Sequence, residues 1–301
     1  MPPIHTSLRT VLVGTSLELA SDPVVRTGVE LARRSGAALH LFHAHTLPVA
    51  YFAAPSGLTT IGPDLLDNEK RVRENLLDQQ LGRLGMTRAD VDGVIIEAGS
   101  PHRMLLREAG NLAADVIVVG SNEGADIVRL GSTADRVLRQ ATVPVWMVDG
   151  RPRMPPRQVL APVDLSDLSA EALERGIRLL DDVCSDEAPT VEALFVLAEE
   201  EVEGSGQFTA EQIRRMAHDE LERFVSASAP DRPTRNEVRE GEVRAEILRH
   251  IAEQPIDLVL LGTHGRSGFE RFLLGSVAAD IASRAGVSAL VIPPERAGET
   301  S

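Results

Sequence analysis

The chain has 301 residues, 43% of them apolar and 25% charged, as is typical of an ordinary globular protein of about two domains. The formal net charge of −14 excludes broad electrostatic binding to nucleic acid and disfavours anionic membrane surfaces, because both need a basic footprint. The single cysteine, Cys184, allows no internal disulfide and fits the reducing cytoplasm.

Neither a signal peptide nor a membrane span is expected. The N-terminus, MPPIHTSLRT, has no apolar core. No apolar run approaches the about 18 residues that cross a bilayer.

Apolar runs and helical patterns alternate along both halves of the chain. Several runs are continuously apolar, as expected for strands that are covered on both faces. Alternating strands and helices predict a doubly wound α/β fold with a parallel sheet of about five strands in each half. The predicted strands are Thr10–Thr15, Ala37–Ala44, Val91–Glu97, Asp115–Gly120, Pro144–Val148, Gln158–Val163, Val191–Leu197, Arg235–Arg239, Asp257–Gly262 and Ser288–Ile292.

The chain repeats itself after about 145 residues, which indicates a duplicated domain. DVIVVG, beginning at Asp115, matches DLVLLG, beginning at Asp257, and Leu-Gly-Ser follows both. The basic, Pro- and Gly-rich stretch Gly150–Pro156 has no periodicity and is typical of a linker. The predicted domains are residues 1–150 and 157–294.

A glycine-rich stretch follows the fourth strand of the second half, GTHGRSGFERFLLGSVAAD. Gly262 ends the strand, and a glycine there lets a ribose or phosphate approach the backbone. Gly275 and Ser276 open a helix, whose N-terminus offers free N–H groups and partial positive charge to a phosphate. The Ser276 hydroxyl suits either a helix cap or a phosphate contact. The glycines alone fit a tight turn as well as a nucleotide loop.

The spacing Gly-x-x-Gly-(nine residues)-Gly-Ser after a fourth strand resembles the nucleotide signature of the universal stress protein family. APVDLSD, beginning at Ala161, resembles that family's first strand with its acidic residue. GSPHRMLLREA, beginning at Gly99, resembles its Gly-x-Pro-His segment, and VSALVIP, beginning at Val287, resembles its last strand. The resemblance covers nearly the whole chain, as two tandem domains. It implies five-stranded sheets of order 3-2-1-4-5 and an adenine-nucleotide alpha-hydrolase-like fold.

The resemblance also implies an adenine nucleotide between the first and fourth strands of the second domain. Asp164, with Pro162 and Val163 before it, matches the acid near the adenosine; a helix cap remains the alternative for Asp164. Val196 matches the residue whose backbone meets adenine. The implied set is Pro162, Val163, Asp164, Val196, Gly262, His264, Gly265, Arg266, Gly275, Ser276 and Val277. ATP is the expected ligand, with AMP or ADP as alternatives, and an accompanying magnesium ion is left open.

The first half departs from this pattern. Its loop is two residues shorter and lacks a counterpart of Gly265, and Ser16 stands where the second half has Asp164. The loop charges sum to −1 in residues 121–130 and to +1 in residues 263–274. Because a carboxylate near a triphosphate repels it by about 1 kcal/mol, we expect the first site to be empty, weak or altered. Gly131 and the residues after it still suit a lone anion at a helix start.

Other polar clusters have plainer interpretations. His43 and His45 share one face of their strand and His40 points the other way, so a metal site would need a third ligand from elsewhere. The acidic stretch 198–207 is expected to be a solvated loop, with a lid or partner contact as the alternative. The more apolar stretch 51–64 is its counterpart, a cover for the first cleft or a docking site.

No catalytic constellation is present, because the sequence lacks a nucleophile–base pair and any residue that would position a water. Slow ATP hydrolysis is the most that is expected. The favoured hypothesis is a nucleotide-dependent stress-response switch with the nucleotide in the second domain. A nucleotide-independent scaffold is the alternative, and an adenylating enzyme lacks its motifs. In the family that the chain resembles, last strands commonly pair across a dimer interface. The resemblance therefore implies that Pro144–Val148 and Ser288–Ile292 pair within this chain as a pseudo-dimer. A homodimer and an unidentified protein partner are further expectations.

Overall fold

The structure is a computed structural model of the chain. It describes residues 8–45, 63–121, 131–150, 152–185, 187–203, 208–230, 232, 234–263 and 274–295.

Ten strands are present in the described residues, and all ten predicted strands are confirmed with ends that differ by two residues or fewer. The strands are β1 Thr10–Gly14, β2 Ala38–His45, β3 Gly93–Ala98, β4 Val116–Gly120, β5 Val145–Val148, β6 Gln158–Val163, β7 Thr190–Leu197, β8 Thr234–Glu240, β9 Leu258–Gly262 and β10 Ser288–Ile292.

Helices alternate with these strands as predicted. They are α1 Asp22–Ser35, α2 Pro63–Arg83, α3 Pro101–Asn111, α4 Ser132–Gln140, α5 Asp167–Val183, α6 Glu199–Glu203, α7 Ala210–Ser228, α8 Val243–Glu253 and α9 Ser276–Arg284, with short 3-10 turns η1 Leu19–Ser21 and η3 Arg88–Asp90. The sequence predicts a loop over 198–207, but α6 forms within it, and residues 204–207 lie outside the described residues. Of the counterpart stretch 51–64, residues 51–62 lie outside the described residues and residues 63–64 begin α2.

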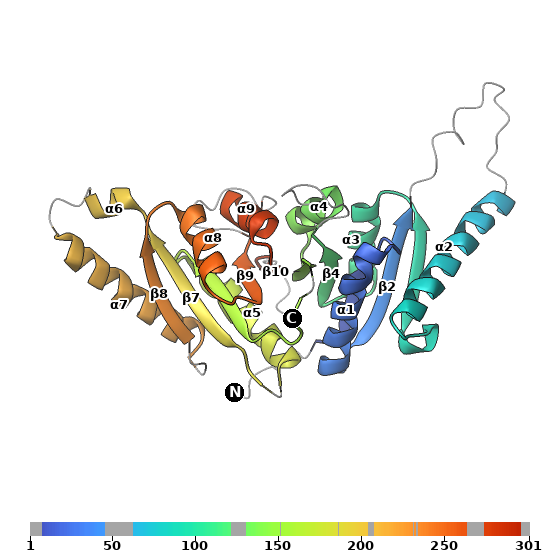
Figure 1. The fold of residues 1–301 in the computed structure, drawn as a ribbon, viewed down its shortest axis with the longest axis horizontal. Coiled ribbons are helices and arrows are strands. Elements are labelled where there is room, and N and C mark those ends of the chain that lie inside the picture. The colour runs from blue at the N-terminus through green and yellow to red at the C-terminus, as the bar shows by residue number, and fades with distance from the viewer. Residues whose placement is uncertain are drawn as a thin grey trace, which may run out of the picture.

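All ten strands form one sheet (Figure 1), in the order β3-β2-β1-β4-β5-β10-β9-β6-β7-β8. Each half has the order 3-2-1-4-5 and only parallel pairs, which confirms the expected topology. The halves join where β5 and β10 pair antiparallel, with Trp146 opposite Leu290. The predicted pairing of the last strands within one chain is therefore present.

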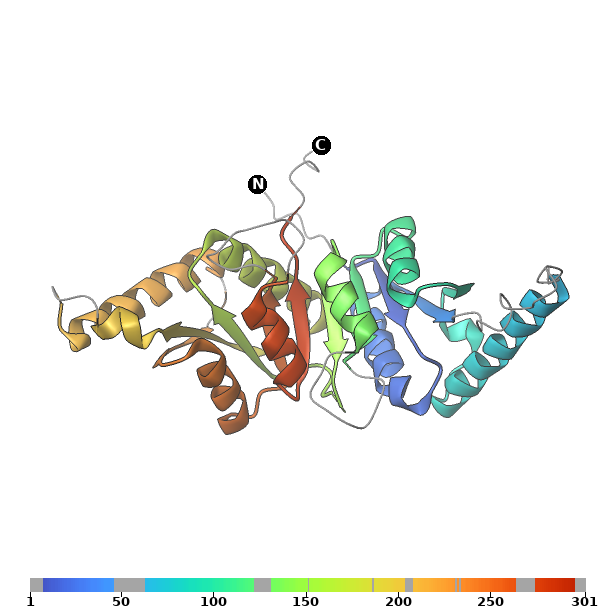
Figure 2. The ribbon, with the colours of Figure 1, turned by 90° about the horizontal axis from the view of Figure 1, so that it is seen from above.

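Helices cover both faces of the sheet (Figure 2). Buried residues of α1, α2, α5 and α7 pack in one apolar cluster, and those of α3, α4, α8 and α9 pack in a second cluster on the other face. Because both faces are covered, the strand interiors are apolar without alternation, as in Val116–Val119.

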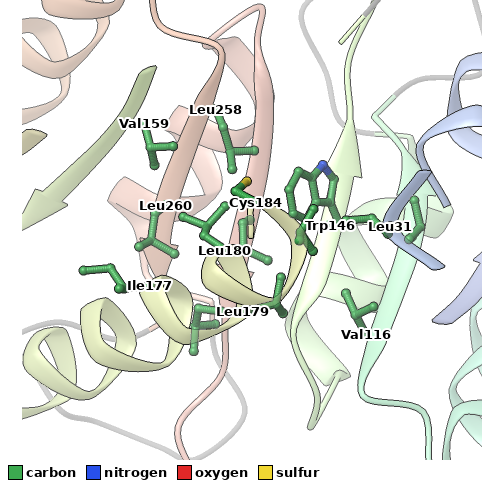
Figure 3. Close-up of a cluster of buried hydrophobic side chains, with 14 of the residues drawn as sticks. Leu31, Val116, Trp146, Val159, Ile177, Leu179, Leu180, Cys184, Leu258 and Leu260 are labelled. Atoms are coloured by element: carbon green, nitrogen blue, oxygen red, sulfur yellow. The ribbon is translucent and has the colours of Figure 1, made fainter. Parts of the chain in front are cut away.

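The seam between the halves has its own apolar packing (Figure 3). Trp146, 1% exposed, lies between Leu31 and Val116 of the first half and Leu180 and Cys184 of the second. One continuous core cluster therefore spans both halves, and burial of this large ring stabilises their contact. The backbone N–H of Leu8 also crosses the seam to Asp182 Oδ2, at 3.0 Å.

Candidate functional site

Most of the predicted site residues that the structure describes in the second domain lie at the carboxyl ends of its strands or at the start of α9. β6 lies between β7 and β9, and all three run parallel, so their carboxyl ends meet. Pro162 and Val163 end β6, Val196 is the penultimate residue of β7, and Gly262 ends β9. The strand order reverses between β6 and β9, which is where ligands bind in open α/β sheets.

Asp164 holds the turn that follows β6. Its Oδ1 accepts hydrogen bonds from the Ser166 backbone N–H at 3.1 Å and from the Ser166 hydroxyl at 2.6 Å. Ser166 in turn caps α5, because its Oγ accepts from the Ser169 N–H at 3.2 Å. Asp164 therefore supports a cap indirectly, and it has this structural role directly after the carboxyl end of β6.

The side chain of Val196 is 8% exposed and belongs to the core cluster below α8 and α9. Only its backbone is thus suited to a polar contact, as the resemblance implies. Val277 is half-buried in the first turn of α9 and packs against the same cluster. His264, Gly265 and Arg266 lie in 264–273, outside the described residues.

The start of α9 lies beside the carboxyl end of β9. Gly275 is its N-cap, with φ −53° and ψ 143°, and no side chain among the described residues caps the helix. The Gly275 N–H donates to the Thr263 carbonyl at 2.7 Å, which closes the base of the loop. An uncapped helix start presents N–H groups and partial positive charge.

Arg244, which the sequence did not single out, places a cation next to this helix start. Arg244 of α8 donates from Nη2 to Ser276 Oγ at 2.9 Å. Ser276 thus accepts from Arg244 and does not cap α9, which removes one of the two roles considered for it. Arg244 lies three residues after Gly241, which matches Gly99 of the first copy, so the repeat could have drawn attention to it. Its contact with Ser276, however, depends on tertiary packing.

The first domain preserves the backbone of this motif. Gly131 caps α4 with φ −54° and ψ 145°, and its N–H donates to the Ser121 carbonyl at 2.8 Å. Residues 122–130 lie outside the described residues. The Gly-Ser helix start is therefore the same structural element in both copies.

The charges around the two helix starts differ. His102 occupies the repeat position of Arg244, and its Nδ1 lies 3.0 Å from Ser100 Oγ. Burial, followed by the charges of Arg136 and Arg103, lowers the pKa of His102, so its imidazole is neutral near pH 7. A permanent cation in the second domain thus corresponds to a neutral ring in the first.

The described residues contain no group of three or more His, Cys, Asp or Glu side chains that could hold a metal ion. Cys184 is buried, and burial raises the pKa of its thiol to about 11. Since the thiolate is the nucleophile, this cysteine is inert at neutral pH. No helix in the described parts of the chain is long and apolar enough to cross a membrane.

The fold and these two helix starts define a class of protein: tandem doubly wound α/β domains with a glycine-serine helix start near the switch point in each half of the sheet. The sequence model described as the universal stress protein family matches residues 7–149 and 156–293. The chain belongs to the universal stress protein family.

Relatives cover the chain as a whole and by halves. A universal stress protein of Mycolicibacterium smegmatis is 27% identical over 94% of this chain and 97% of its own length. Universal stress protein A homolog 2 of Coxiella burnetii is 32% identical over 46% of this chain and 92% of its own. The crystal structure of a universal stress protein from Archaeoglobus fulgidus matches 95% of this chain and 98% of its own, with TM-score 0.63 and 17% identity, which supports the fold.

Proposed function

We propose that the second domain binds ATP, or ADP or AMP, between β6 and β9, and that nucleotide occupancy acts as a switch in a stress response. The observation that carries the proposal is the start of α9, where the helix has no side-chain cap and the guanidinium of Arg244 is hydrogen-bonded to Ser276 Oγ. Both features favour phosphate. The glycines and Arg266 of the adjoining loop would complete the phosphate contacts, as the family resemblance implies.

Different residues at the carboxyl ends of the strands would contact different parts of the nucleotide. The backbone around Val196 and the strand end at Pro162 and Val163 would meet the adenine ring, and Asp164 would lie toward the ribose. Gly262 would let the sugar or phosphate approach β9 without a Cβ. An accompanying magnesium ion would be held by the phosphates, since the described residues supply no metal-ligand group of their own.

The first domain is proposed not to bind a nucleoside triphosphate. It lacks the counterpart of Arg244, and Ser16 replaces Asp164. Occupancy would thus be one nucleotide per chain. A switch follows if the nucleotide binds one conformation more tightly than another, because only differential affinity shifts a population.

Isothermal titration and thermal unfolding with ATP test this proposal. We expect one site per chain and a rise in melting temperature, both abolished by Gly275→Glu. A Cβ at Gly275 would lie 3.2 Å from the Thr263 carbonyl, so Gly275→Ala is the matched control for this crowding. Gly275→Ala should retain most of the ATP response if the carboxylate of the Glu variant is what repels phosphate.

Arg244→Met gives a second, less invasive test. Removing a charged hydrogen bond to phosphate should weaken ATP binding about tenfold or more and leave adenosine binding unchanged. Comparing the affinities for ATP, ADP and AMP then shows how many of the phosphates the site recognises. Two equal sites per chain would refute the asymmetry. The absence of any ATP response in the wild-type chain would favour the nucleotide-independent scaffold.

A further inference from the structure

The first domain contains a cavity of about 590 Å³ at the carboxyl ends of β1, β2 and β4. Its walls come from the loop after β1, the end of β2, α2, α3 and the start of α4. This volume is within the range of small-molecule sites. The domain whose glycine loop departs from the nucleotide pattern therefore still has a built cleft.

Two histidine rings on β2 line this cavity. His43 is 9% exposed, and its Nδ1 lies 2.9 Å from the Thr15 carbonyl oxygen. Because a carbonyl only accepts, Nδ1 carries the proton and Nε2 is left as an acceptor. His43 Nε2 and His45 Nδ1 are both buried without a hydrogen-bond partner among the described residues. The rings are nearly parallel, with centroids 6.2 Å apart.

Orphaned polar atoms are unusual, since most buried nitrogen and oxygen atoms in proteins are hydrogen-bonded. Two buried, unpartnered nitrogens on residues that line one cavity indicate a polar partner. The Thr15 carbonyl satisfies the Nδ1–H of His43, whereas its accepting nitrogen, Nε2, has no partner among the described residues. The partner of His43 Nε2 must therefore be a hydrogen-bond donor.

A buried polar network fixes this arrangement. Thr15 Oγ1 donates to Gln80 Oε1 at 2.8 Å and lies 2.9 Å from Ser21 Oγ. Gln80, which is fully buried, donates from Nε2 to Ser21 Oγ and to Asp22 Oδ1. The network holds Thr15 in place, and the Thr15 carbonyl sets the tautomer of His43.

The fold itself does not require this polar wall. The register of β1 with β2 and of β6 with β7 places Phe195 and Leu197 at the positions of His43 and His45. Both residues are 6% exposed and belong to the core, and Val163 occupies the position of Thr15. The same fold is thus built with an apolar wall in the second domain, so the imidazoles of the first serve another purpose.

The described residues that line the cavity do not favour a polyphosphate. Arg73 is the one arginine among them, its Nη2 lies 3.2 Å from Glu69 Oε2, and Glu18 adds a carboxylate to the wall. Burial, the first cause, lowers the pKa of His43 and of His45, so both rings are neutral near pH 7. The remaining lining includes the apolar side chains of Phe42 and Leu105.

We propose that the cavity of the first domain is a second ligand site, for an uncharged ring compound that donates N–H or O–H hydrogen bonds to His43 and His45. The apolar side chains would pack against the ring, and the polar wall would orient it. The two domains would then take ligands of different charge, a nucleotide in the second and an uncharged donor in the first.

The test uses the full chain carrying Gly275→Glu, which removes phosphate-dependent binding from the second domain. Binding of an uncharged probe in the first domain is then identified by the signals of His43 and by the loss of affinity when His43 and His45 are replaced. Adenosine, uridine and phenol serve as uncharged probes with N–H or O–H donors, and ATP is the charged counterpart of adenosine. Imidazole ¹⁵N spectra report each histidine nitrogen, and calorimetry gives the affinity. We expect at least one uncharged probe to shift the Nε2 signal of His43, and ATP to bind at least about tenfold more weakly than adenosine if adenosine binds.

The matched variant is His43→Phe with His45→Leu, which places in the first domain the residues that the second already accommodates. It should fold, as circular dichroism would verify, and should weaken probe binding about tenfold or more. Three outcomes would overturn the proposal: no probe shifts the His43 signal, which leaves bridging water as the partner; the double variant binds the probe as the wild type does; or ATP binds as tightly as adenosine.

Discussion

At the residue scale, the repeat allows each position to be compared with its own duplicate. Arg244 and His102 occupy equivalent places near a helix start, yet one is a permanent cation and the other a buried neutral ring. His43 and Phe195 form a second such pair. Because these pairs lie on matching strands and helices, the differences in side chain are the basis of the two different ligands that we propose.

A pH dependence of stability follows from His43. Burial, the largest cause, lowers its pKa below the ordinary value of 6.5. The unfolded chain therefore binds the proton more readily, and stability must fall as the pH drops through about 6.5. We expect the melting temperature to decrease between about pH 7.5 and pH 5 and to decrease less in His43→Phe.

Part of this decrease will remain in the variant, because the pKa values of His45 and His102 are lowered as well. Differential scanning calorimetry across the pH range measures the effect. An identical pH profile for wild type and variant would mean that His43 does not titrate with unfolding.

At the scale of the element, the first helix of each domain approaches its sheet through one glycine. A Cβ on Gly28 of α1 would lie 2.2 Å from Val13 Cγ2, and a Cβ on Gly176 of α5 would lie 2.3 Å from Leu260 Cδ1. These positions are equivalent in the repeat, so the close packing of helix on strand is a requirement of the fold. The Gly-Ser helix starts at Gly131 and Gly275 are likewise shared.

Gly28→Ala should therefore destabilise the protein although alanine favours helices. Overpacking of a core costs about 1–3 kcal/mol, and the gain in helix propensity is about 1 kcal/mol. We expect a net loss of up to about 2 kcal/mol in the free energy of unfolding, measured by urea denaturation.

Gly110→Ala is the matched control in α3, because a Cβ there meets nothing within 4 Å. It should raise the free energy of unfolding by up to about 1 kcal/mol. If Gly28→Ala were stabilising to the same degree, the close approach of α1 to β1 would be contradicted.

At the scale of the whole molecule, the antiparallel pairing of β5 with β10 makes one sheet and one core of two domains. Each last strand would otherwise be an exposed sheet edge that invites pairing with another chain. Within this chain the two edges satisfy each other. A homodimer, if formed, must use a different surface from these two strands.

The seam predicts cooperative unfolding. Trp146 is the only tryptophan in the sequence and is buried at the seam, so its fluorescence reports the contact between halves. We expect the fluorescence and circular dichroism transitions in urea to coincide, as in a two-state protein. Trp146→Ala should remove about 3–5 kcal/mol of stability and separate the unfolding of the halves.

Ile247→Ala serves as the control, because Ile247 is equally buried in α8, within the core cluster that does not contain Trp146. It should lower stability while circular dichroism still shows a single transition. Two separate transitions in the wild-type chain would contradict the coupling.

The sequence by itself determined the duplication, the ten strands and a parallel sheet in each half. These features are encoded locally, in apolar runs, glycines and helix spacing, and each half carries its own copy. The strand order and the pairing of the last strands were expected from the resemblance to the universal stress protein family. The second-domain residues Pro162, Val196 and Gly262 could be placed at one edge for the same reason, since parallel strands end together.

Only the tertiary structure decided which side chains meet. Arg244 reaches Ser276 across 32 positions of sequence, and Thr15 fixes His43 through a network with Gln80, 65 positions away from Thr15. No local pattern encodes such contacts, because they depend on how helices pack on the sheet. The same packing produced the cavity of the first domain, where the sequence alone indicated only a lost motif.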